Sequence, residues 1–250
     1  IDYTMSSISG IDGLKPTIEI IKYTKKIAIA NKEAIICGWD LIEKQLKKNK
    51  TDFIPVDSEH FSIWSLLKNE SINNVEKIII TASGGPFLNY KLNKLKNARS
   101  KDAIKHPNWN MGKKISIDSA TLMNKVFEII EAFKIFKFDR SKYKIIIHPQ
   151  SYVHSIIRFK NGLIKMILYN ADMKIPISNI LYGKKKDISN TMQFKEKKFN
   201  SLFFQEVNKK QFPSVHLIKK VLKLGPATPT IINAANEVLV DMFLNNKIGF

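Results

Sequence analysis

The composition of this 250-residue chain is typical of a globular protein, because 44% of its residues are apolar and can bury a sizeable core. The single cysteine, Cys37, excludes an intrachain disulfide framework and favours a reducing compartment. No apolar run reaches the length of a membrane span, so we expect no membrane partner. The chain starts at Ile1 rather than at an initiator Met and stops abruptly at Phe250, so we expect a fragment of a longer protein.

The formal charge of +19 comes almost entirely from lysine, since only three of the 41 basic residues are arginines. The lysines are scattered through a chain that is also rich in Asn and Ile, which is typical of A/T-rich codon usage. A nucleic-acid interface would gather Arg and aromatic residues on one element. We therefore expect no nucleic-acid partner, and a basic binding module is the alternative to an enzyme.

The first 50 residues predict alternating helices and strands. A helix is expected over 16–23, a buried strand over 27–30 and a second helix over 32–48. Asn31, Lys32 and Glu33 follow this strand directly, at the position where open α/β sheets bind ligands. The alternative is that Asn31 is an ordinary N-cap of the second helix.

A second strand runs into the polar sequence Asp57-Ser58-Glu59. If this segment is extended, its two carboxylates share one face and Ser58 points away from them. Two carboxylates so close repel each other unless a cation lies between them, so the pattern predicts a metal site. A capped helix start is the alternative and is compatible with a metal.

A third strand, 77–82, leads directly into Ser83-Gly84-Gly85-Pro86. The glycines permit close backbone approach, so Ser83 is a candidate contact for a phosphate or substrate, although a tight turn explains the sequence equally well. Further on, Trp109 lies in a polar loop over 104–112. This loop is predicted to be a lid over a ligand.

A helix with an unusual polar face is predicted from Asp118 or Ser119, either of which is the expected N-cap. Asn124, Lys125 and Glu128 lie at i, i+1 and i+4, so an amide, an ammonium and a carboxylate project side by side. A hydroxyl at a helix N-terminus with a lysine nearby suits a phosphate, and the carboxylate suits a hard metal. The alternative is an amphipathic helix with a solvated polar face.

Three further features complete the chain. A strand from 144 precedes a hairpin of strands over 152–160 and 163–169, marked by Asn161-Gly162. Residues 183–210 lose periodicity and predict a linker. An amphipathic helix is expected over 230–244, and it needs a partner surface.

Taken in order, these polar motifs are similar to those of the 1-deoxy-D-xylulose 5-phosphate reductoisomerases. The similarity covers the chain from about Ile8 to its end. The motifs that carry it are Asn31-Lys32-Glu33, Pro55-Val56-Asp57-Ser58-Glu59-His60, Ser83-Gly84-Gly85-Pro86-Phe87, His106-Pro107-Asn108-Trp109, Met111-Gly112-Lys113-Lys114, Asp118-Ser119-Ala120-Thr121, Asn124-Lys125, Glu128, His148-Pro149-Gln150-Ser151, His154 and Asn233-Ala234-Ala235-Asn236-Glu237.

The resemblance implies an NADPH- and metal-dependent enzyme of non-mevalonate isoprenoid synthesis. The family rearranges 1-deoxy-D-xylulose 5-phosphate and reduces the product to 2-C-methyl-D-erythritol 4-phosphate. The expected fold class is α/β: the tail of a Rossmann-like cofactor domain, an α/β catalytic domain and the start of a helical C-terminal domain. The boundaries that follow are 1–49 for the NADPH-binding part, 50–183 for the catalytic domain, 184–210 for the linker and 211–250 for the helical domain.

The resemblance also implies a role for each site residue. Asp57, Glu59 and Glu128 are expected to hold Mn²⁺, Mg²⁺ or Co²⁺, and Lys32 and His106 join them as catalytic residues. His154 is given a supporting role near the substrate, and Glu131 is a candidate support for the metal ligands. Substrate contacts are expected from Lys32, Ser58, Glu59, Ser83, His106, Trp109, Ser119, Asn124, Lys125 and Glu128, and cofactor contacts from Asn31, Glu33 and Gly112.

Some departures from the family pattern accompany the resemblance. Nothing before Ile8 can serve as the family's glycine-rich motif for the NADPH pyrophosphate, and the family's last helices are missing after Phe250. Smaller changes, none of them at an expected metal ligand, are Ala34, Asn110, Asn170-Ala171 and Ser214. We also expect a homodimer in a bacterial cytoplasm, with a plastid as the alternative location. Another metal-dependent phosphosugar enzyme is a further alternative for the function.

Overall fold

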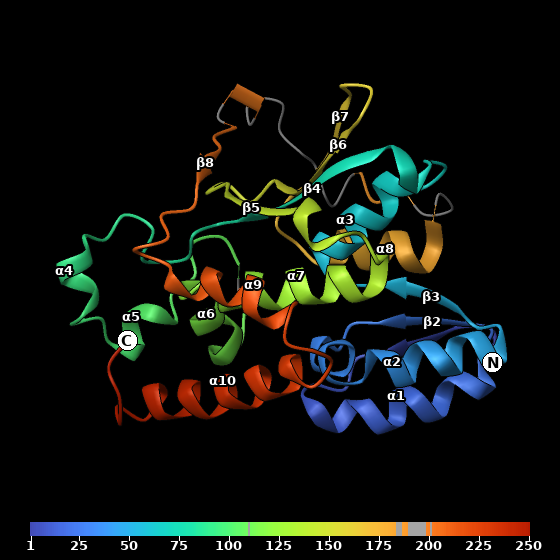
Figure 1. Ribbon diagram of the computed structural model, residues 1–250, viewed down its shortest axis with the longest axis horizontal. Coiled ribbons are helices and arrows are strands. Elements are labelled where there is room, and N and C mark those ends of the chain that lie inside the picture. Colours follow the sequence, from blue (N-terminus) through green and yellow to red (C-terminus); the bar gives the residue numbers. More distant parts are fainter. Residues whose placement is uncertain (110, 184–186, 190–198, 201) are drawn as a thin grey trace.

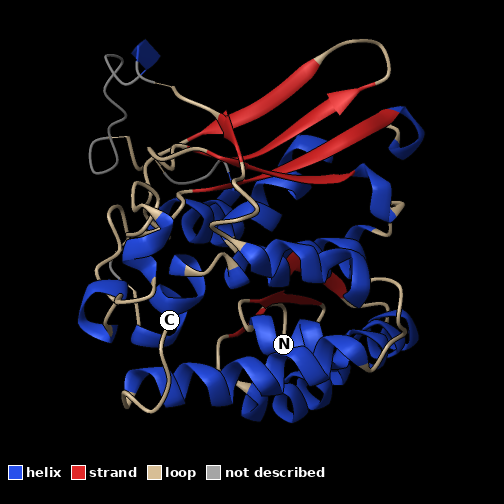
Figure 2. Ribbon diagram, turned by 60° about the vertical axis from the view of Figure 1, so that its left-hand side comes forward, coloured by secondary structure: helices blue, strands red, loops and turns tan. Residues whose placement is uncertain are grey.

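The computed structural model describes residues 1–109, 111–183, 187–189, 199, 200 and 202–250. Two β-sheets are stacked with helices between and below them, and Figure 2 shows the larger sheet above a layer of helices and the smaller sheet below it. Both sheets contain parallel strands, and helices connect most of them (Figure 1). The expected α/β class is confirmed.

The smaller sheet contains three parallel strands in the order β1-β2-β3. Its centre is apolar because Ile27 and Ile29 of β2 pack on Trp39 and Ile42 of the following helix. Because β2 is buried in this way, the position of the residues that follow it is fixed relative to the sheet. The elements of this unit are β1 (Thr4–Ser6), α1 (Leu14–Ile20), β2 (Lys26–Ile29), α2 (Lys32–Asn49) and β3 (Asp52–Pro55).

The larger sheet is mixed and has the order β7-β6-β4-β5-β8. Among the neighbouring strand pairs of the described residues, β4 and β5 are parallel, and the other pairs of this sheet are antiparallel, including β4 with β6. The predicted hairpin is present, since β6 pairs antiparallel with β7. The strands are β4 (Val75–Ala82), β5 (Tyr143–Ile147), β6 (Val153–Phe159), β7 (Ile164–Leu168) and β8 (Gln205–Glu206).

Two helices connect the sheets and carry the polar motifs between them. Helix α3 (Ser58–Leu67) contacts β3 of the smaller sheet and β6 of the larger one. Helix α7 (Met123–Phe136) contacts β4 and α2. Their apolar sides are buried, with Ile63 of α3 and Ile129 of α7 in one core with the larger sheet. The polar sides of both helices are therefore held at the boundary between the sheets.

The helix predicted to start at Asp118 or Ser119 is in fact two helices, so that prediction is wrong. Helix α6 (Lys113–Ala120) starts earlier, and α7 follows after a break at Leu122, whose backbone is left-handed with φ 59°. The apolar side chain of Leu122 is buried, and this burial offsets the cost of the conformation. Ser119 consequently lies in the last turn of α6 rather than at a helix N-terminus.

The expected linker is partly incorporated into the larger sheet. Gln205–Glu206 form β8, which pairs antiparallel with the end of β5. This pairing satisfies backbone hydrogen-bonding groups at the edge of the sheet. The lysine-rich composition of the segment gave no indication of a strand. The predicted linker residues 184–186, 190–198 and 201 lie outside the described residues.

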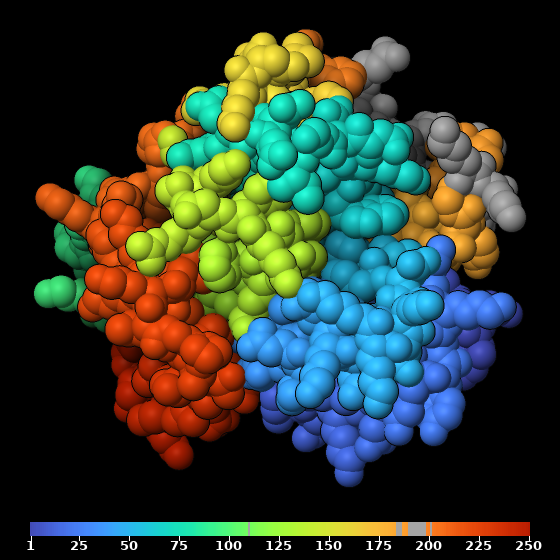
Figure 3. Space-filling view, turned by 45° about the vertical axis from the view of Figure 1, so that its right-hand side comes forward, coloured from blue at the N-terminus to red at the C-terminus, as the bar shows by residue number. Residues whose placement is uncertain are grey.

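The C-terminal segment packs beside the N-terminal one. Helix α9 (Leu217–Val221) contacts α7, and the expected last helix is α10 (Thr228–Leu244), which contacts α2 and α6. Figure 3 shows the blue N-terminal and the red C-terminal segments side by side. The remaining short helices are α4 (Leu92–Leu95), α5 (Ser100–Ala103) and α8 (Lys174–Tyr182). Among the described residues, no helix is both long and apolar enough to cross a membrane.

Candidate active site

The polar motifs converge on a cavity of about 620 Å³ at the carboxyl ends of parallel strands. Lys32 follows β2, Asp57 follows β3 and Ser83 follows β4. Carboxyl ends of parallel strands are the usual ligand sites of α/β proteins, because the connecting loops there are free to carry polar groups. Every residue predicted for the site lines this cavity: Asn31, Lys32, Glu33, Asp57, Ser58, Glu59, Ser83, His106, Trp109, Gly112, Ser119, Asn124, Lys125 and Glu128.

The segment Asp57-Ser58-Glu59 is the start of a helix, so the capped-helix alternative is confirmed and the extended conformation is not present. Asp57 is the N-cap of α3, and its carboxylate accepts a hydrogen bond from the Glu59 backbone N–H at 3.2 Å. A carboxylate at this position satisfies a free N–H group of the first turn. The Ser58 hydroxyl therefore does not point away but donates to the Glu59 carboxylate.

A third carboxylate completes the group from another element. Ligand oxygens of Asp57, Glu59 and Glu128 all lie within 4.8 Å of one another, although Glu128 comes from α7. Oxygen ligands at this spacing match what Mg²⁺ and Mn²⁺ prefer, and the donor set fits a hard divalent cation. The structure thus brings together the three residues that the sequence grouped.

Lys125 lies against two of these carboxylates. Its ammonium contacts Glu59 and is 2.8 Å from Glu128 Oε2. Burial alone would raise the pKa of Glu59, but the Lys125 charge lowers it to about 2. Burial and the neighbouring Glu59 carboxylate raise the pKa of Glu128 to about 8. The two glutamates therefore differ in proton affinity. Such perturbed pKa values are often found at functional sites.

Lys32 is the second buried cation of the cavity wall. Its Nζ atom is 2.9 Å from Asp57 Oδ2 and 2.8 Å from Glu131 Oε2. Burial by itself would lower the pKa of Lys32, but the carboxylates of Asp57 and Glu131 raise it well above its ordinary value. Lys32 is therefore a permanent cation at the end of β2.

The loop before α6 closes one side of the cavity. His106 Nε2 is 2.9 Å from Ser83 Oγ, and its Nδ1 accepts backbone N–H groups of Asn108 at 3.1 Å and Trp109 at 3.0 Å. These contacts assign the proton to Nε2, which donates to Ser83. Trp109 packs edge-on against His154, with ring centroids 5.8 Å apart. The loop therefore places an aromatic ring beside the carboxylates.

The predicted phosphate residues are brought together by a close backbone approach. A Cβ atom on Gly85 would lie 2.9 Å from the Ala120 Cα and the Ser119 carbonyl, so only glycine permits this contact. Gly85 also has a φ of 64°. The turn after β4 is consequently held against the end of α6, where Ser83 and Ser119 both line the cavity.

Two of the predicted cofactor residues have structural contacts of their own. Asn31 is the N-cap of α2, since its side chain accepts from Ala34 N at 2.6 Å and donates to Gly10 O at 2.8 Å. Glu33 pairs with Lys114 at 3.3 Å. The capping alternative for Asn31 is therefore present in the structure, and its role toward a cofactor stays a prediction.

The cavity wall also contains residues that were not predicted for the site. Lys114 and Asp118 of α6 and Ser151 after β5 line it. Asn108 Nδ2 donates to Ser151 Oγ at 2.9 Å, and Ser151 has a φ of 55°. The available signal for Ser151 was its place in the polar segment that follows β5, because loops after parallel strands commonly carry ligand contacts.

Fold and site together define an α/β protein in which three clustered carboxylates and two lysines share one cavity. The chain belongs to the 1-deoxy-D-xylulose 5-phosphate reductoisomerase family. Family models described as 1-deoxy-D-xylulose 5-phosphate reductoisomerase, its C-terminal domain and the DXP reductoisomerase C-terminal domain match residues 1–38, 53–136 and 168–250.

Curated relatives carry the same family name. The reductoisomerase of Pelagibacter ubique is 56% identical over 250 residues, covering 100% of this chain and 64% of the relative. That of Wolbachia pipientis is 47% identical over 253 residues, covering 100% of this chain and 65% of the relative. The chain thus spans slightly less than two-thirds of the length of these relatives.

Solved structures of the family share the fold. The Zymomonas mobilis reductoisomerase in complex with NADPH has a TM-score of 0.91 and 38% identity, covering 99% of this chain and 64% of that one. A DOX-P reductoisomerase in complex with NADPH, fosmidomycin and magnesium has a TM-score of 0.92 and 35% identity, covering 100% of this chain and 64% of that one.

Proposed function

We propose that the protein carrying this chain converts 1-deoxy-D-xylulose 5-phosphate to 2-C-methyl-D-erythritol 4-phosphate with NADPH and a divalent metal. The observation that carries the proposal is the meeting of Asp57, Glu59 and Glu128 beside Lys32 and Lys125 in one cavity. Family membership supports the substrate, and similar structures that hold NADPH, fosmidomycin and magnesium support the cofactors.

The three carboxylates are the proposed ligands of Mn²⁺, Mg²⁺ or Co²⁺. A bound divalent cation would stabilise negative charge on neighbouring substrate oxygens as a carbon–carbon bond breaks and forms. Lys125 now contacts Glu59 and Glu128, so its ammonium has to move away from them when the cation binds. The freed ammonium would then be available to the anionic substrate.

Polar side chains around the carboxylates supply the proposed substrate contacts. Lys32, Ser58 and His106 would hold oxygens of the sugar near the reacting carbons, and the neutral His106 ring donates through Nε2. Ser83, Ser119, Asn124 and Lys125 would hold the phosphate, and all four line the cavity. The phosphate contacts position the substrate with binding energy from a group that does not react.

NADPH would approach from the smaller sheet. Asn31, Glu33 and Gly112 line the cavity together with residues 7–10 from before α1, and Asn31 donates to Gly10 O at 2.8 Å. The cofactor supplies the hydride for the reduction. Trp109 would cover the reacting groups and exclude water, because its ring already packs on His154, whose Nδ1 is 4.0 Å from Glu59 Oε1.

Organisation and location are part of the same proposal. We propose the domain limits 1–49, 50–183 and 211–250, with 184–210 as the linker between the last two, in which Gln205–Glu206 pair with β5. A homodimer is proposed on the family resemblance alone. A bacterial cytoplasm is proposed as the location, supported by bacterial relatives, with a plastid as the alternative.

The test is NADPH oxidation by the protein expressed from its complete reading frame. We expect oxidation that requires both 1-deoxy-D-xylulose 5-phosphate and Mn²⁺ and that stops with chelator. Glu128→Gln removes a metal ligand charge and should lower turnover at least about 100-fold. Near-normal turnover of a folded Glu128→Gln protein would contradict the metal assignment. Absence of oxidation by the folded wild type would contradict the proposed reaction.

A further inference from the structure

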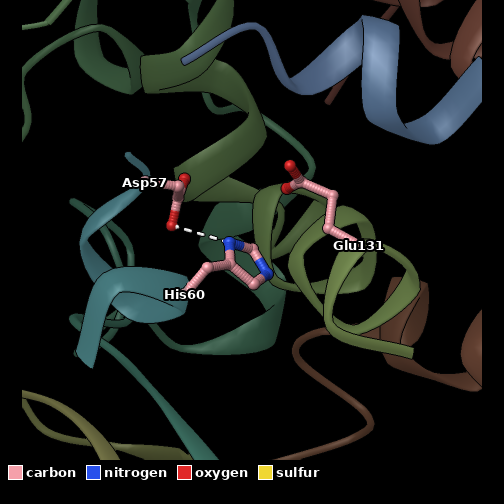
Figure 4. Close-up of side chains that lie close together, drawn as sticks. All are labelled: Asp57, His60 and Glu131. Carbon is pink, nitrogen blue, oxygen red and sulfur yellow. Dashed lines mark ion pairs between the residues drawn. The ribbon is translucent and has the colours of Figure 1, made fainter. Parts of the chain in front are cut away.

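Two buried ionisable side chains lie immediately behind the candidate site. Glu131 is 1% exposed and His60 is fully buried. Neither is among the described residues that line the cavity. Figure 4 shows the His60 ring turned toward Asp57, with Glu131 approaching from a separate helix. Their place behind the cavity wall excludes direct contact with a ligand.

Glu131 is directed toward Lys32 by its place on α7. It follows Glu128 by three residues, so both carboxylates lie on the same side of the helix. The Lys32 ammonium is 2.8 Å from Glu131 Oε2 and 3.9 Å from Glu128 Oε1. Glu131 therefore contacts Lys32 from the protein interior, while Glu128 faces the cavity.

Lys32 needs such a contact to have a defined position. A lysine side chain has four rotatable bonds, and one partner does not hold its ammonium in place. Asp57, its other close partner at 2.9 Å, is a proposed metal ligand. If Asp57 bound a metal, part of its negative charge would be neutralised, and its attraction for the Lys32 ammonium would weaken. Glu131 is the close partner of Lys32 that is not a proposed metal ligand.

His60 supports Asp57 in a similar way. His60 Nδ1 is 3.2 Å from Asp57 Oδ1, and its Nε2 is 2.9 Å from the Glu128 backbone oxygen. The ring thus links the start of α3 to α7. It lies beside the Asp57 oxygen Oδ1, whereas Lys32 contacts the other oxygen, Oδ2.

A second metal site is the competing explanation of the same residues. Ligand atoms of Asp57, His60 and Glu131 lie within 4.8 Å of one another. However, the Lys32 ammonium already contacts the carboxylates of both Asp57 and Glu131. A metal there would have to displace Lys32 from both carboxylates. Neither His60 nor Glu131 is among the described residues that line the cavity, whereas Glu59 and Glu128 do line it.

We propose that Glu131 is a positioning residue that holds the Lys32 ammonium in place for an oxygen of the phosphosugar substrate. This rests on the proposed function. Glu131 does not touch the substrate and acts only through Lys32. Its effect should therefore appear in substrate binding and disappear when Lys32 is replaced.

Substrate binding is measured by titrating 1-deoxy-D-xylulose 5-phosphate into the full protein with Mn²⁺ and without NADPH. Trp109 lines the cavity, so tryptophan fluorescence reports binding without turnover. Glu131→Ala should weaken binding about tenfold, as removal of a supporting contact typically does. Glu131→Gln should weaken binding less, because its amide oxygen still accepts from Lys32. Melting temperatures verify that each variant is folded.

The matched control is Glu76→Gln, which removes one exposed ion pair with Arg158 and should leave binding unchanged. In a Lys32→Met background, replacing Glu131 by Gln should add no further loss. Unchanged binding in both Glu131 variants would overturn the proposal. So would a Glu131→Gln effect in the Lys32→Met background as large as the effect in the wild type. A Glu131→Gln protein that loses its Mn²⁺-induced rise in melting temperature would favour the second metal site instead. Failure of the wild type to bind the sugar phosphate would count against the proposed function, a separate outcome.

Discussion

His106 shows how the surroundings of one residue determine its charge. Its Nδ1 accepts two backbone N–H groups, and its Nε2 faces Ser83. Burial and the nearby Lys125 charge lower the pKa of His106 to about 4. The ring is therefore neutral at physiological pH and can donate a hydrogen bond without adding a third positive charge to the site.

This lowered pKa makes stability depend on pH. The unfolded chain binds a proton on His106 near pH 6.5, whereas the folded chain binds it only near pH 4. The contribution of the neutral ring is fully present above pH 6.5 and is lost as the pH falls toward 4. Between pH 7 and pH 4.5, we expect the melting temperature to decrease more in the wild type than in His106→Gln.

The expected difference is small because the ring is only half buried. After allowance for solvent screening it is about 1 kcal/mol, or roughly 2–4 °C in a chain of this size. The other histidines titrate equally in both proteins and cancel in the comparison. Parallel pH profiles of the two proteins would show that the pKa of His106 is not lowered by folding.

At the scale of elements, the approach of the turn after β4 to the end of α6 organises the predicted phosphate contacts. This approach depends on Gly85, where a Cβ atom would meet backbone atoms of Ser119 and Ala120. Backbone atoms of a packed helix cannot move aside as a flexible side chain can. The break between α6 and α7 then turns Asn124 and Lys125 toward the same space.

Replacing Gly85 by Ala should therefore destabilise the protein by about 2–4 kcal/mol, through its positive φ and the backbone overlap. The matched control is Gly84→Ala. Gly84 also has a positive φ, but its new Cβ would meet only the flexible Leu88 side chain. Free energies of unfolding from urea denaturation give the comparison. Equal losses in both variants would contradict the importance of the backbone contact.

At the scale of the whole molecule, α10 is tied to the candidate site through a chain of polar contacts. Asn236 of α10 donates to Asp118 Oδ1 at 2.7 Å, and Lys114 is 3.4 Å from Asp118 Oδ2 and 3.3 Å from Glu33. Three elements distant in sequence, α10, α6 and α2, are thus linked through Asp118 and Lys114 of α6. The motif Asn233 to Glu237 therefore has a structural role behind the cavity.

Asn236→Ala should lower the free energy of unfolding by about 1–3 kcal/mol, because it removes the amide donor to Oδ1 of the buried Asp118 carboxylate, which keeps only the longer contact of Oδ2 with Lys114. Asn245→Ala at the exposed end of the same helix is the control and should cost less, since its amide bonds only to Asp241. Chemical denaturation of both variants measures the difference. A loss no larger for Asn236 than for Asn245 would mean that the contact does not anchor α10.

Much of the fold was predictable from local pattern. Strands β2 and β4 are short apolar runs, the Asn161-Gly162 turn marks a hairpin, and α2 and α10 follow helical periodicity. The start of α3 was not, because its capping residue Asp57 is equally compatible with an extended strand end. The start of α6 was missed because Gly112 and the lysines after it are weak helix signals, whereas Asp118 resembles an N-cap.

The sequence by itself determined which chemical groups are present and in which order. Spacing identified Asp57 and Glu59 as a pair and placed Asn124, Lys125 and Glu128 on one helix face, because these relations depend only on local geometry. Only the tertiary structure decided which groups meet. Lys32 and Glu131 are 99 residues apart and come into contact because α2 packs on α7. The left-handed turn at Leu122 is likewise a tertiary effect, since burial in the core offsets a backbone conformation that the local sequence disfavours.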